Sequence, residues 1–423
     1  MSHSVCRSSA PRSQPPAARY SQRLTTIALA AFLSLPTVTQ AEVTPIPAFA
    51  RKYKVSCRLC HNPAPTQTDF GGTFAGNGFR LTSDEAPRDT IDTGDSLLEL
   101  AADLPLAIRL DGYVVGSTDG KGTDIQAPYN LKILSGGTIS SKLSYYLYFF
   151  LFERGEVGGI EDAYLYVNDI GGGPVDLIAG QFQVSDPMFK RELRLEYDDY
   201  AIYRARVGAQ PADLTYDRGV TGVISPDPIT ISLTVVNGNG KGEAEPDRRL
   251  DNDALKNFFG HVTGSVTPYL RLGAMAYFGR QEGQIGAGPE LKNDLFMIGA
   301  DATVSLSELE VNLQYIHRSD DNPTFTTDEN TANTNGGFIE AIYRFPGERW
   351  YALGLWNYIY TSCGGCGLPL LDARLGGPPG DRYHTLSGGA GYMVRRNVRL
   401  LGELGWDIEQ EDARVVLGIS AAY

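Results

Sequence analysis

Hydrophobic and polar residues alternate with a period of two over most of the chain after residue 105. The apolar members of three such stretches are Leu106, Ile108, Leu110 and Val114; Val398, Leu400, Leu404, Trp406 and Ile408; and Val415, Leu417, Ile419, Ala421 and Tyr423. Polar, charged or glycine residues such as Arg109, Asp111 and Glu403 separate them. Successive side chains of a β-strand point to opposite faces, so this pattern predicts strands with one apolar and one polar face. Such strands are typical of a transmembrane β-barrel.

The alternating stretches predict sixteen strands. We expect them to begin near residues 105, 128, 142, 160, 174, 214, 228, 260, 268, 292, 307, 335, 348, 382, 397 and 412. Tight turns are expected near 140–141, 225–228, 267–268, 346–348 and 395–397, and long polar loops near 117–127, 185–213, 237–257, 319–334 and 361–381. An even strand number places both barrel ends on the periplasmic side. We therefore predict an all-β fold, a 16-stranded antiparallel, porin-like transmembrane barrel over residues 105–423.

A soluble all-β sandwich or propeller is the alternative, because alternation alone does not exclude it. Aromatic residues favour the membrane, since they gather at both membrane interfaces of such barrels. The candidates are Tyr145, Tyr146, Tyr148, Phe149, Phe150, Phe152, Trp350, Tyr351, Trp356, Tyr358 and Tyr360. The loop 185–213 is too long for a simple turn. We expect it to fold into the lumen and line a constriction, with a flexible surface loop as the alternative.

The first 41 residues have the pattern of an export signal. Four arginines and no acidic residue precede an apolar stretch at 24–35, which ends in the small-residue site Thr39-Gln40-Ala41. About twelve apolar residues fall short of the roughly 20 that a spanning helix needs, so a signal peptide is favoured over an anchor. Without these residues the chain has 33 basic and 50 acidic residues, a net charge of -17. That charge argues against nucleic acid as a partner.

Cys57-Arg58-Leu59-Cys60-His61 has the spacing of a c-type haem attachment site. Two thiols on one turn can reach the two vinyl groups of a haem, and His61 then faces the iron as the proximal ligand. A zinc half-site or a redox dithiol is the alternative. Zinc would need a second ligand pair nearby, and residues 62–187 contain no Cys, His or Met. We predict one covalent haem c in a segment at residues 42–104.

The second pair, Cys363-Gly364-Gly365-Cys366, is followed by glycine and not by histidine. We expect a loop disulfide there, since the compartment is oxidising. The haem segment supplies no second axial ligand of its own and is too small to bury a haem alone. We therefore expect it to plug the lumen and the barrel to complete the pocket. By strand parity or loop position, the candidate distal ligands are Met188, Met275, Met297 and His261.

Three stretches of the haem segment resemble the fused outer-membrane monohaem cytochrome-porins, the family that includes bacterial iron oxidases. They are residues 46–53, the Cys57-x-x-Cys60-His61 site, and the stretch from Asp69-Phe70-Gly71 to Asn77-Gly78-Phe79-Arg80. Over the barrel the resemblance is architectural. Asn62-Pro63-Ala64-Pro65 departs from the Thr or Ser with an aromatic that the family pattern has after the histidine, so haem-edge contacts are not inferred from it.

The resemblance implies an outer-membrane electron conduit. It would oxidise an extracellular donor, Fe(II) being the leading candidate, by outer-sphere transfer and pass the electrons to a periplasmic carrier such as a soluble cytochrome or a copper protein. A porin-type diffusion channel with a haem-bearing plug or sensor is the alternative, and electron flow outward is another. Acidic loop residues are expected to concentrate cations. They are Glu243, Glu245, Asp247, Asp251, Asp253, Asp320 and Asp321.

Overall fold

The computed structural model describes residues 48–81, 90–98, 100–101, 105–251, 253–283, 288–366, 369–371, 375 and 380–423. The predicted signal peptide and residues 42–47 lie outside this part of the chain. The helices are α2 (Ala48–Tyr53), η1 (Cys57–Leu59), α3 (Asp69–Gly76), η2 (Ile170–Gly172), η3 (Arg191–Leu193) and α4 (Ala201–Arg204). No helix in the described part of the chain is both long and apolar enough to cross a bilayer.

Eighteen strands are formed by the described residues. They are β1 (Thr90–Ile91), β2 (Leu100–Ala101), β3 (Leu106–Ser117), β4 (Gly122–Thr138), β5 (Leu143–Glu153), β6 (Gly159–Val167), β7 (Val175–Gln183), β8 (Tyr216–Ile224), β9 (Ile229–Val236), β10 (Asn257–Thr267), β11 (Leu270–Gly283), β12 (Leu291–Leu306), β13 (Leu309–Asp320), β14 (Ala332–Arg344), β15 (Trp350–Cys363), β16 (Arg382–Arg395), β17 (Val398–Asp407) and β18 (Asp412–Ala422).

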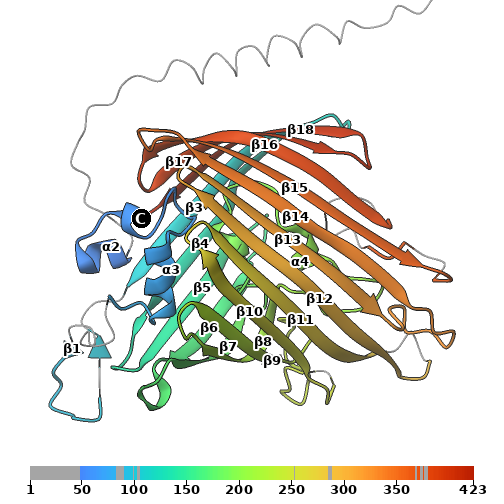
Figure 1. The fold of residues 1–423 in the computed structure, drawn as a ribbon, viewed down its shortest axis with the longest axis horizontal. Helices are drawn as coiled ribbons and strands as arrows, with labels where there is room; N and C mark the ends of the chain where they lie inside the picture. Colours follow the sequence, from blue (N-terminus) through green and yellow to red (C-terminus); the bar gives the residue numbers. More distant parts are fainter. Residues whose placement is uncertain are drawn as a thin grey trace, which may run out of the picture. The chain divides into compact units, whose positions relative to one another are not determined.

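Strands β3 to β18 form one closed antiparallel barrel in which each strand pairs with its neighbours in sequence (Figure 1). Pairing of β18 with β3, from Arg414 opposite Ser117 to Ala422 opposite Arg109, closes the sheet. The prediction of a sixteen-stranded antiparallel barrel is confirmed. β1 and β2 form a separate two-stranded sheet.

The hairpin between β3 and β4 corrects one predicted loop. Residues 117–127 were expected to form a long polar loop, but β3 continues to Ser117 and β4 begins at Gly122, which leaves a short turn. The polar residues there belong to strands that extend beyond the apolar wall. The long loops near 185–213, 237–257, 319–334 and 361–381 are present, at residues 184–215, 237–256, 321–331 and 364–381.

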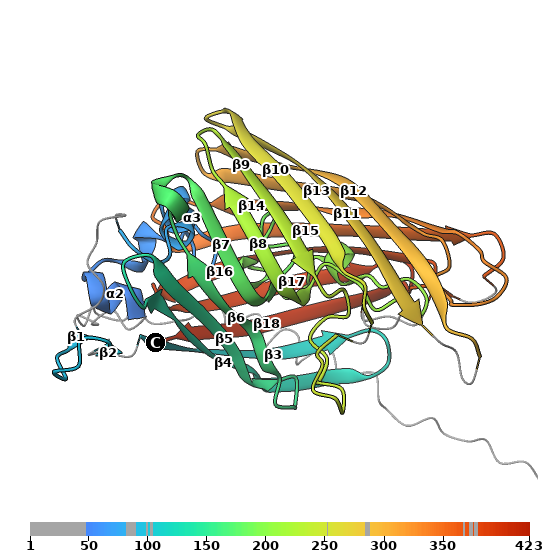
Figure 2. The same cartoon turned by 90° about the horizontal axis from the view of Figure 1, so that it is seen from below.

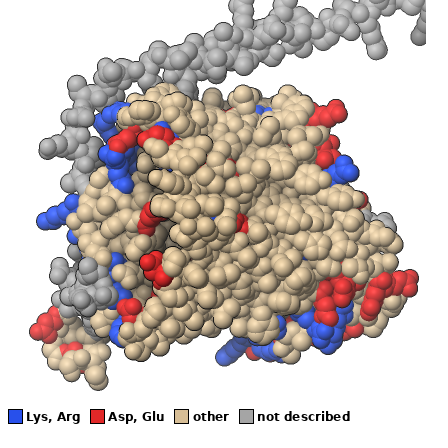
Figure 3. Space-filling view, in the orientation of Figure 1, with Lys and Arg blue, Asp and Glu red and all other residues tan. Residues whose placement is uncertain are grey.

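The outer wall of the barrel is apolar, because alternate side chains of every strand point outward. Large apolar residues such as Leu233, Val266 and Leu404 are more than 60% exposed there, whereas Glu403, next to Leu404, is 2% exposed. Charged side chains gather at the two ends of the strands and are sparse between them (Figure 3).

The same alternation corrects the predicted aromatic girdles. Trp350 and Trp356 are exposed on the outer wall, but Tyr148, Phe150 and Tyr351 are at most 3% exposed and point into the lumen. A run of consecutive aromatic residues in a strand cannot lie on one face, so only alternate members can meet an interface.

The barrel interior is filled on one side by the loop 184–215, as predicted from its length. Its apolar residues pack against lumenal side chains of β9 to β15, and α4 contacts β14 and β15. Tyr200 stacks on Phe338 with ring centroids 4.1 Å apart, and Tyr203 donates a hydrogen bond to Gln314 (2.8 Å). Figure 2 shows segments of this loop inside the ring of strands.

Two outward substitutions test whether the apolar wall faces lipid. Leu233→Arg, in the middle of β9, should lower the free energy of unfolding in lipid vesicles by about 2–4 kcal/mol, because a charge at the bilayer midplane is desolvated. Val266→Arg, near the end of β10, should cost about 0–1 kcal/mol. Denaturant titration measures both. Equal, small effects at the two sites would argue for a wall that faces water.

Candidate functional site

One compact turn brings together the three residues of the haem motif. Ser56 caps η1 by accepting a hydrogen bond from the backbone N–H of Arg58. The backbone N–H groups of Cys60 and His61 donate to the carbonyl of Cys57, at 3.2 and 2.9 Å. The turn therefore holds both thiols and the imidazole within five residues.

The N-terminus of helix α3 is hydrogen-bonded to this turn. The Thr68 side chain caps α3 through the N–H of Gly71 (3.1 Å) and donates to the carbonyl of Leu59 (2.7 Å). The Thr68 N–H donates to the carbonyl of Cys60 (2.9 Å). Gly71 has to be glycine, because a Cβ there would lie 2.2 Å from the Cys60 carbonyl oxygen. The contact explains why Asp69-Phe70-Gly71 occurs at this distance from the cysteines.

The imidazole of His61 is oriented for a ligand. Its Nδ1 lies 2.8 Å from the carbonyl oxygen of Pro65, which can only accept, so Nδ1 bears the proton and Nε2 keeps its lone pair. Burial lowers the pKa of His61, which favours the neutral form that binds metals. Asn62-Pro63-Ala64-Pro65 thus has a structural role, since its last carbonyl fixes the histidine.

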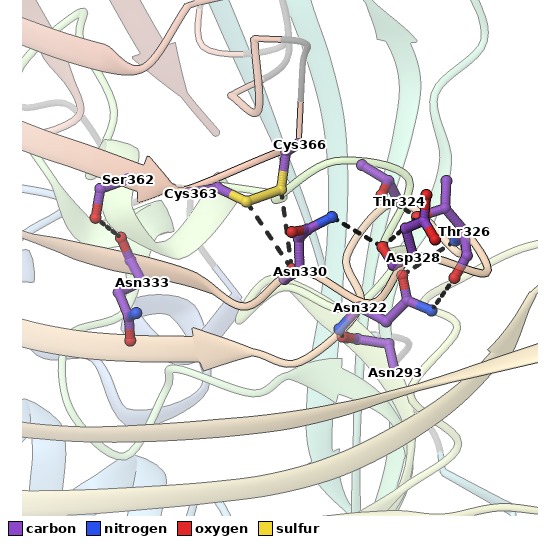
Figure 4. Close-up of a disulfide and its surroundings, with 10 residues drawn as sticks. All are labelled: Asn293, Asn322, Thr324, Thr326, Asp328, Asn330, Asn333, Ser362, Cys363 and Cys366. Atoms are coloured by element: carbon purple, nitrogen blue, oxygen red, sulfur yellow. Dashed lines mark hydrogen bonds between the residues drawn. A yellow bond between two sulfur atoms is a disulfide. The ribbon is translucent and has the colours of Figure 1, made fainter.

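The thiols of Cys57 and Cys60 are free and partly buried. Burial raises the pKa of both thiols. The predicted second pair differs, because Cys363 and Cys366 form a disulfide with Cα atoms 5.8 Å apart, which confirms that prediction (Figure 4). Both of its sulfur atoms lie 3.9 Å from the carbonyl oxygen of Asn330 in the neighbouring long loop. The first pair therefore has free thiols that can react, whereas the second pair is oxidised to a disulfide.

Aromatic rings join the haem segment to the barrel wall. Phe49 stacks on Phe79 (5.3 Å between centroids) and meets Phe74 edge-on (5.1 Å). Phe79 in turn stacks on Tyr146 of β5 (5.5 Å), which is close to Tyr164 of β6 (5.5 Å). These rings form one side of an apolar environment next to the cysteines.

The haem segment lies at the short-turn end of the barrel. Arg51 donates to the carbonyl of Leu106 (2.7 Å) and Tyr166 to the carbonyl of Gly76 (2.6 Å). On the opposite wall, Arg344 of β14 donates to the carbonyl of Asn62 (2.6 Å). Figures 1 and 2 both show α2 and α3 at the end where β18 finishes. The segment thus spans the mouth between strands that are far apart in the sequence.

A cavity of about 960 Å³ lies between this segment and the lumen. Cys57, Cys60 and His61 line it on one side. On the barrel side it is lined by residues of β3 to β9, β11 to β14 and β18 and by the start of the loop 184–215, including Tyr146 and Met188. Its volume is at the upper end of the roughly 300–1,000 Å³ that is usual for cofactor sites. Two free thiols, an available imidazole nitrogen and an apolar lining fit a c-type haem.

The inward loop adds a charged border to the cavity. Lys190 pairs with Asp186 (2.5 Å), and Lys132 of β4 pairs with Glu192 (2.9 Å), which also accepts from Tyr148 (2.5 Å). Burial alone would raise the pKa of Glu192, but the adjacent cations, Lys132 first among them, hold that pKa well below its usual range. Further charged and tyrosine side chains of this loop are buried or half-buried, namely Arg191, Arg194, Tyr197, Asp198, Asp199 and Tyr200.

The four candidate distal ligands are all buried in the lumen; Met188, Met275 and Met297 belong to one apolar cluster, and His261 is paired with Met275 across β10 and β11. Met188 lines the same cavity as Cys57 and His61. Met275 and Met297 pack in the apolar cluster beneath the inward loop. His261 Nε2 is hydrogen-bonded to Asp301 (2.8 Å), so that nitrogen already has a partner. Of the four, Met188 alone is among the residues that line the cavity.

Comparison with known proteins identifies the barrel fold. No protein-family model and no curated protein matches the chain. Among solved structures, the trimer form of OmpT from Vibrio cholerae is 11% identical with a TM-score of 0.55, covering 76% of this chain and 99% of that one. The outer membrane channel DcaP of Acinetobacter baumannii (11%, 0.53, covering 76% and 97%) and an anion-selective porin from Comamonas acidovorans (12%, 0.53, covering 76% and 99%) are also similar. The chain has the porin-type barrel fold.

Methionine exchange tests the distal position. If Met188 supplies the sixth ligand to a bound haem, Met188→Leu should change the optical spectrum from six-coordinate low-spin to five-coordinate, because the thioether sulfur is lost while the side-chain volume is nearly kept. Met275→Leu and Met297→Leu are matched controls and should leave the spectrum unchanged. An unaltered spectrum for Met188→Leu would remove this residue as a ligand.

Proposed function

We propose that the chain is an outer-membrane electron conduit. One c-type haem, held by Cys57, Cys60 and His61, would take electrons from Fe(II) at the long-loop side and deliver them to a periplasmic carrier. The observation that carries this proposal is the cavity between the haem segment and the lumen, which both thiols and the imidazole line. An apolar outer wall and the porin-type fold support a location in the outer membrane.

Distance favours a haem at this place. The hydrocarbon layer is about 30 Å thick, so a cofactor wholly below the membrane would leave most of that gap uncrossed. The cavity extends from the segment at the short-turn mouth past Tyr148 to Asn312 and Glu340 inside the lumen. A haem in it would lie within the barrel end, as the sequence analysis expects.

The chain's own residues would bind the haem, orient its histidine ligand and exclude water from one side of it. Cys57 and Cys60 would anchor the haem through thioethers, and the Pro65 carbonyl fixes the ring of His61. Phe49, Phe79 and Tyr146 shield one side of the site. The haem supplies one-electron chemistry when bound. One electron leaves Fe(II), which becomes Fe(III), and one electron reduces the carrier, so no bond forms or breaks and no general base is needed.

A diffusion channel is the second candidate, because the solved structures that share the fold include a porin and an outer membrane channel. Two features oppose it. The haem segment bonds to opposite walls of the short-turn mouth, and the loop 184–215 fills part of the lumen. The long loops also join at the other end, where Gly208 N–H donates to the Leu370 carbonyl (2.8 Å) and Ala209 N–H to that of Pro323 (2.9 Å).

The acidic loop residues are only partly free to attract Fe(II). Asp320 is fully buried and paired with Arg318 (2.7 Å), and Asp253 accepts hydrogen bonds from backbone N–H groups. Glu243, Glu245 and Asp247 are exposed on the loop 237–256. Exposed carboxylates that can attract cations therefore remain on this loop and at Asp321 of the loop 321–331. The expectation for Asp253 and Asp320 is corrected, because buried, paired carboxylates present little charge to solvent.

Loss of either motif cysteine tests the attachment. Cys57→Ala and Cys60→Ala should each reduce covalent haem, measured by haem staining after denaturing electrophoresis, because each thiol forms one thioether. Cys363→Ala is the matched control and should keep full staining, since that sulfur is bonded to Cys366. Staining that survives the double substitution of Cys57 and Cys60 would contradict the haem site.

Stopped-flow mixing tests the direction and the donor. Fe(II) added to oxidised protein should reduce the haem in a single phase, with one Fe(III) formed for each haem. Liposomes containing the protein should show little flux of small solutes beyond the empty-liposome rate. A haem that stays oxidised in Fe(II), together with solute flux, would replace the conduit with the channel.

A further inference from the structure

Four cationic side chains line the haem cavity, and three of them already have a carboxylate partner. These are Arg109 with Asp111 (3.0 Å), Lys190 with Asp186 (2.5 Å) and Arg396 with Glu348 (2.7 Å). The fourth, Arg271, has no acidic group within 4.0 Å among the residues that the structure describes. Arg271 is thus the cavity cation without an ion-pair partner among the described residues. Two carboxylates of adjacent strands also line the cavity, but Glu310 is paired with Arg344 (2.7 Å) and Glu340 accepts hydrogen bonds from Tyr200 and Asn312.

The position of Arg271 directs its donors into the cavity. It is the second residue of β11 and faces the lumen beside Thr303 of β12, whose hydroxyl accepts a hydrogen bond from Nη2 (3.2 Å). Its guanidinium carbon lies 5.7 Å from the ring centroid of Phe189 on the inward loop. A guanidinium has five N–H donors, and these contacts use few of them. The remaining donors are available to a ligand.

The wall around Arg271 is rich in hydroxyl groups. The cavity-lining hydroxyls are those of Thr221, Ser232, Thr234, Thr303 and Ser305, from β8, β9 and β12. Thr303 already donates its proton to Asn312 (2.9 Å), and Thr221 and Thr234 are hydrogen-bonded to each other (2.9 Å). The hydroxyls of Ser232 and Ser305 are therefore the candidates for donation to an anion beside the guanidinium, and they carry no charge that would compete for the cation.

We propose that Arg271, with the hydroxyl of Ser305, binds the carboxylate of a haem propionate. This inference rests on the proposed function. A haem attached through its vinyl edge at Cys57 and Cys60 directs its propionate edge away from them. A buried carboxylate is strongly unfavourable unless it is paired, and the planar guanidinium fork can bind one through two parallel hydrogen bonds. Arg271 would supply the positive charge, not already paired with a carboxylate of the protein, that a buried propionate needs.

The midpoint potential of haem-loaded protein tests this role. Arg271→Gln should lower the potential relative to the wild type, because a nearby cation favours the reduced haem. It should also make the potential depend more steeply on pH, since an unpaired propionate titrates at higher pH. Arg271→Lys should restore much of the wild-type potential. Arg280→Gln, on the same strand but exposed and paired with Asp294 (2.6 Å), is the matched control and should change nothing.

A free anion has the same chemistry as a propionate, and phosphate titration separates the two sources. If the propionate occupies Arg271, added phosphate should leave the wild-type potential unchanged at constant ionic strength. A phosphate-dependent potential that Arg271→Gln abolishes would assign the site to a free anion and overturn the propionate. Haem-loaded Arg271→Gln with wild-type potential and pH dependence would overturn the site alone, whereas wild-type protein without covalent haem would overturn the proposed function with it.

Discussion

The barrel depends on one constraint, which is that every backbone N–H and C=O group of the wall has to find its partner within the sheet. A hydrocarbon surrounding offers no such partner, so a sheet can stand in it only if the first and last strands pair. Here β18 pairs with β3 over nine positions, from Arg414 opposite Ser117 to Ala422 opposite Arg109. Once the sheet is closed, strand parity decides for each residue whether it faces the outside or the lumen.

Closure creates a polar interior whose charges have to be satisfied locally. Lys132 meets Glu192, Arg318 meets Asp320 and Arg414 meets Asp198, in each case at 2.9 Å or less. Two of these three acids belong to the loop 184–215, so this loop brings carboxylates to cations that the wall provides. Folding the loop inward therefore neutralises lumenal charge as well as covering apolar residues such as Phe338 and Met297.

Much of the wall could be predicted from the sequence, because one local rule fixes it. All sixteen barrel strands follow from alternation, which the lipid and lumen faces impose on each strand separately. The rule fails where a strand leaves the apolar zone, as at Gly122, and where consecutive aromatic residues such as Tyr148 and Phe149 were assigned to one interface. The first prediction failed because a polar composition was taken to indicate a loop. The second failed because neighbouring aromatic residues were placed on one face although side chains of a strand alternate.

The residues of the candidate site also include some that the sequence predicts and others that only the fold brings together. Cys57, Cys60 and His61 could be proposed as a haem site from the sequence because covalent haem attachment demands their spacing. The proposed role of Arg271 had no sequence signal, since it follows from the absence of an ion-pair partner around it in the described structure. The contacts of Phe79 with Tyr146 and of Thr66 with Leu193 join residues 67 and 127 positions apart, and only barrel closure brings them together.

The hydrogen bond between Arg344 and Asn62 joins residues 282 positions apart, and the ion pair of Arg58 with Glu348 fastens the haem segment over a longer span still. Contacts of such separation can form only after the intervening chain is arranged, because each closes a very large loop. The haem segment can therefore be fastened to this wall only after β14 has formed, although it precedes the barrel in the chain. If the segment carries the proposed haem, its cysteines would stay accessible to an attaching enzyme until then, so the order of assembly would provide the time in which the cofactor is added.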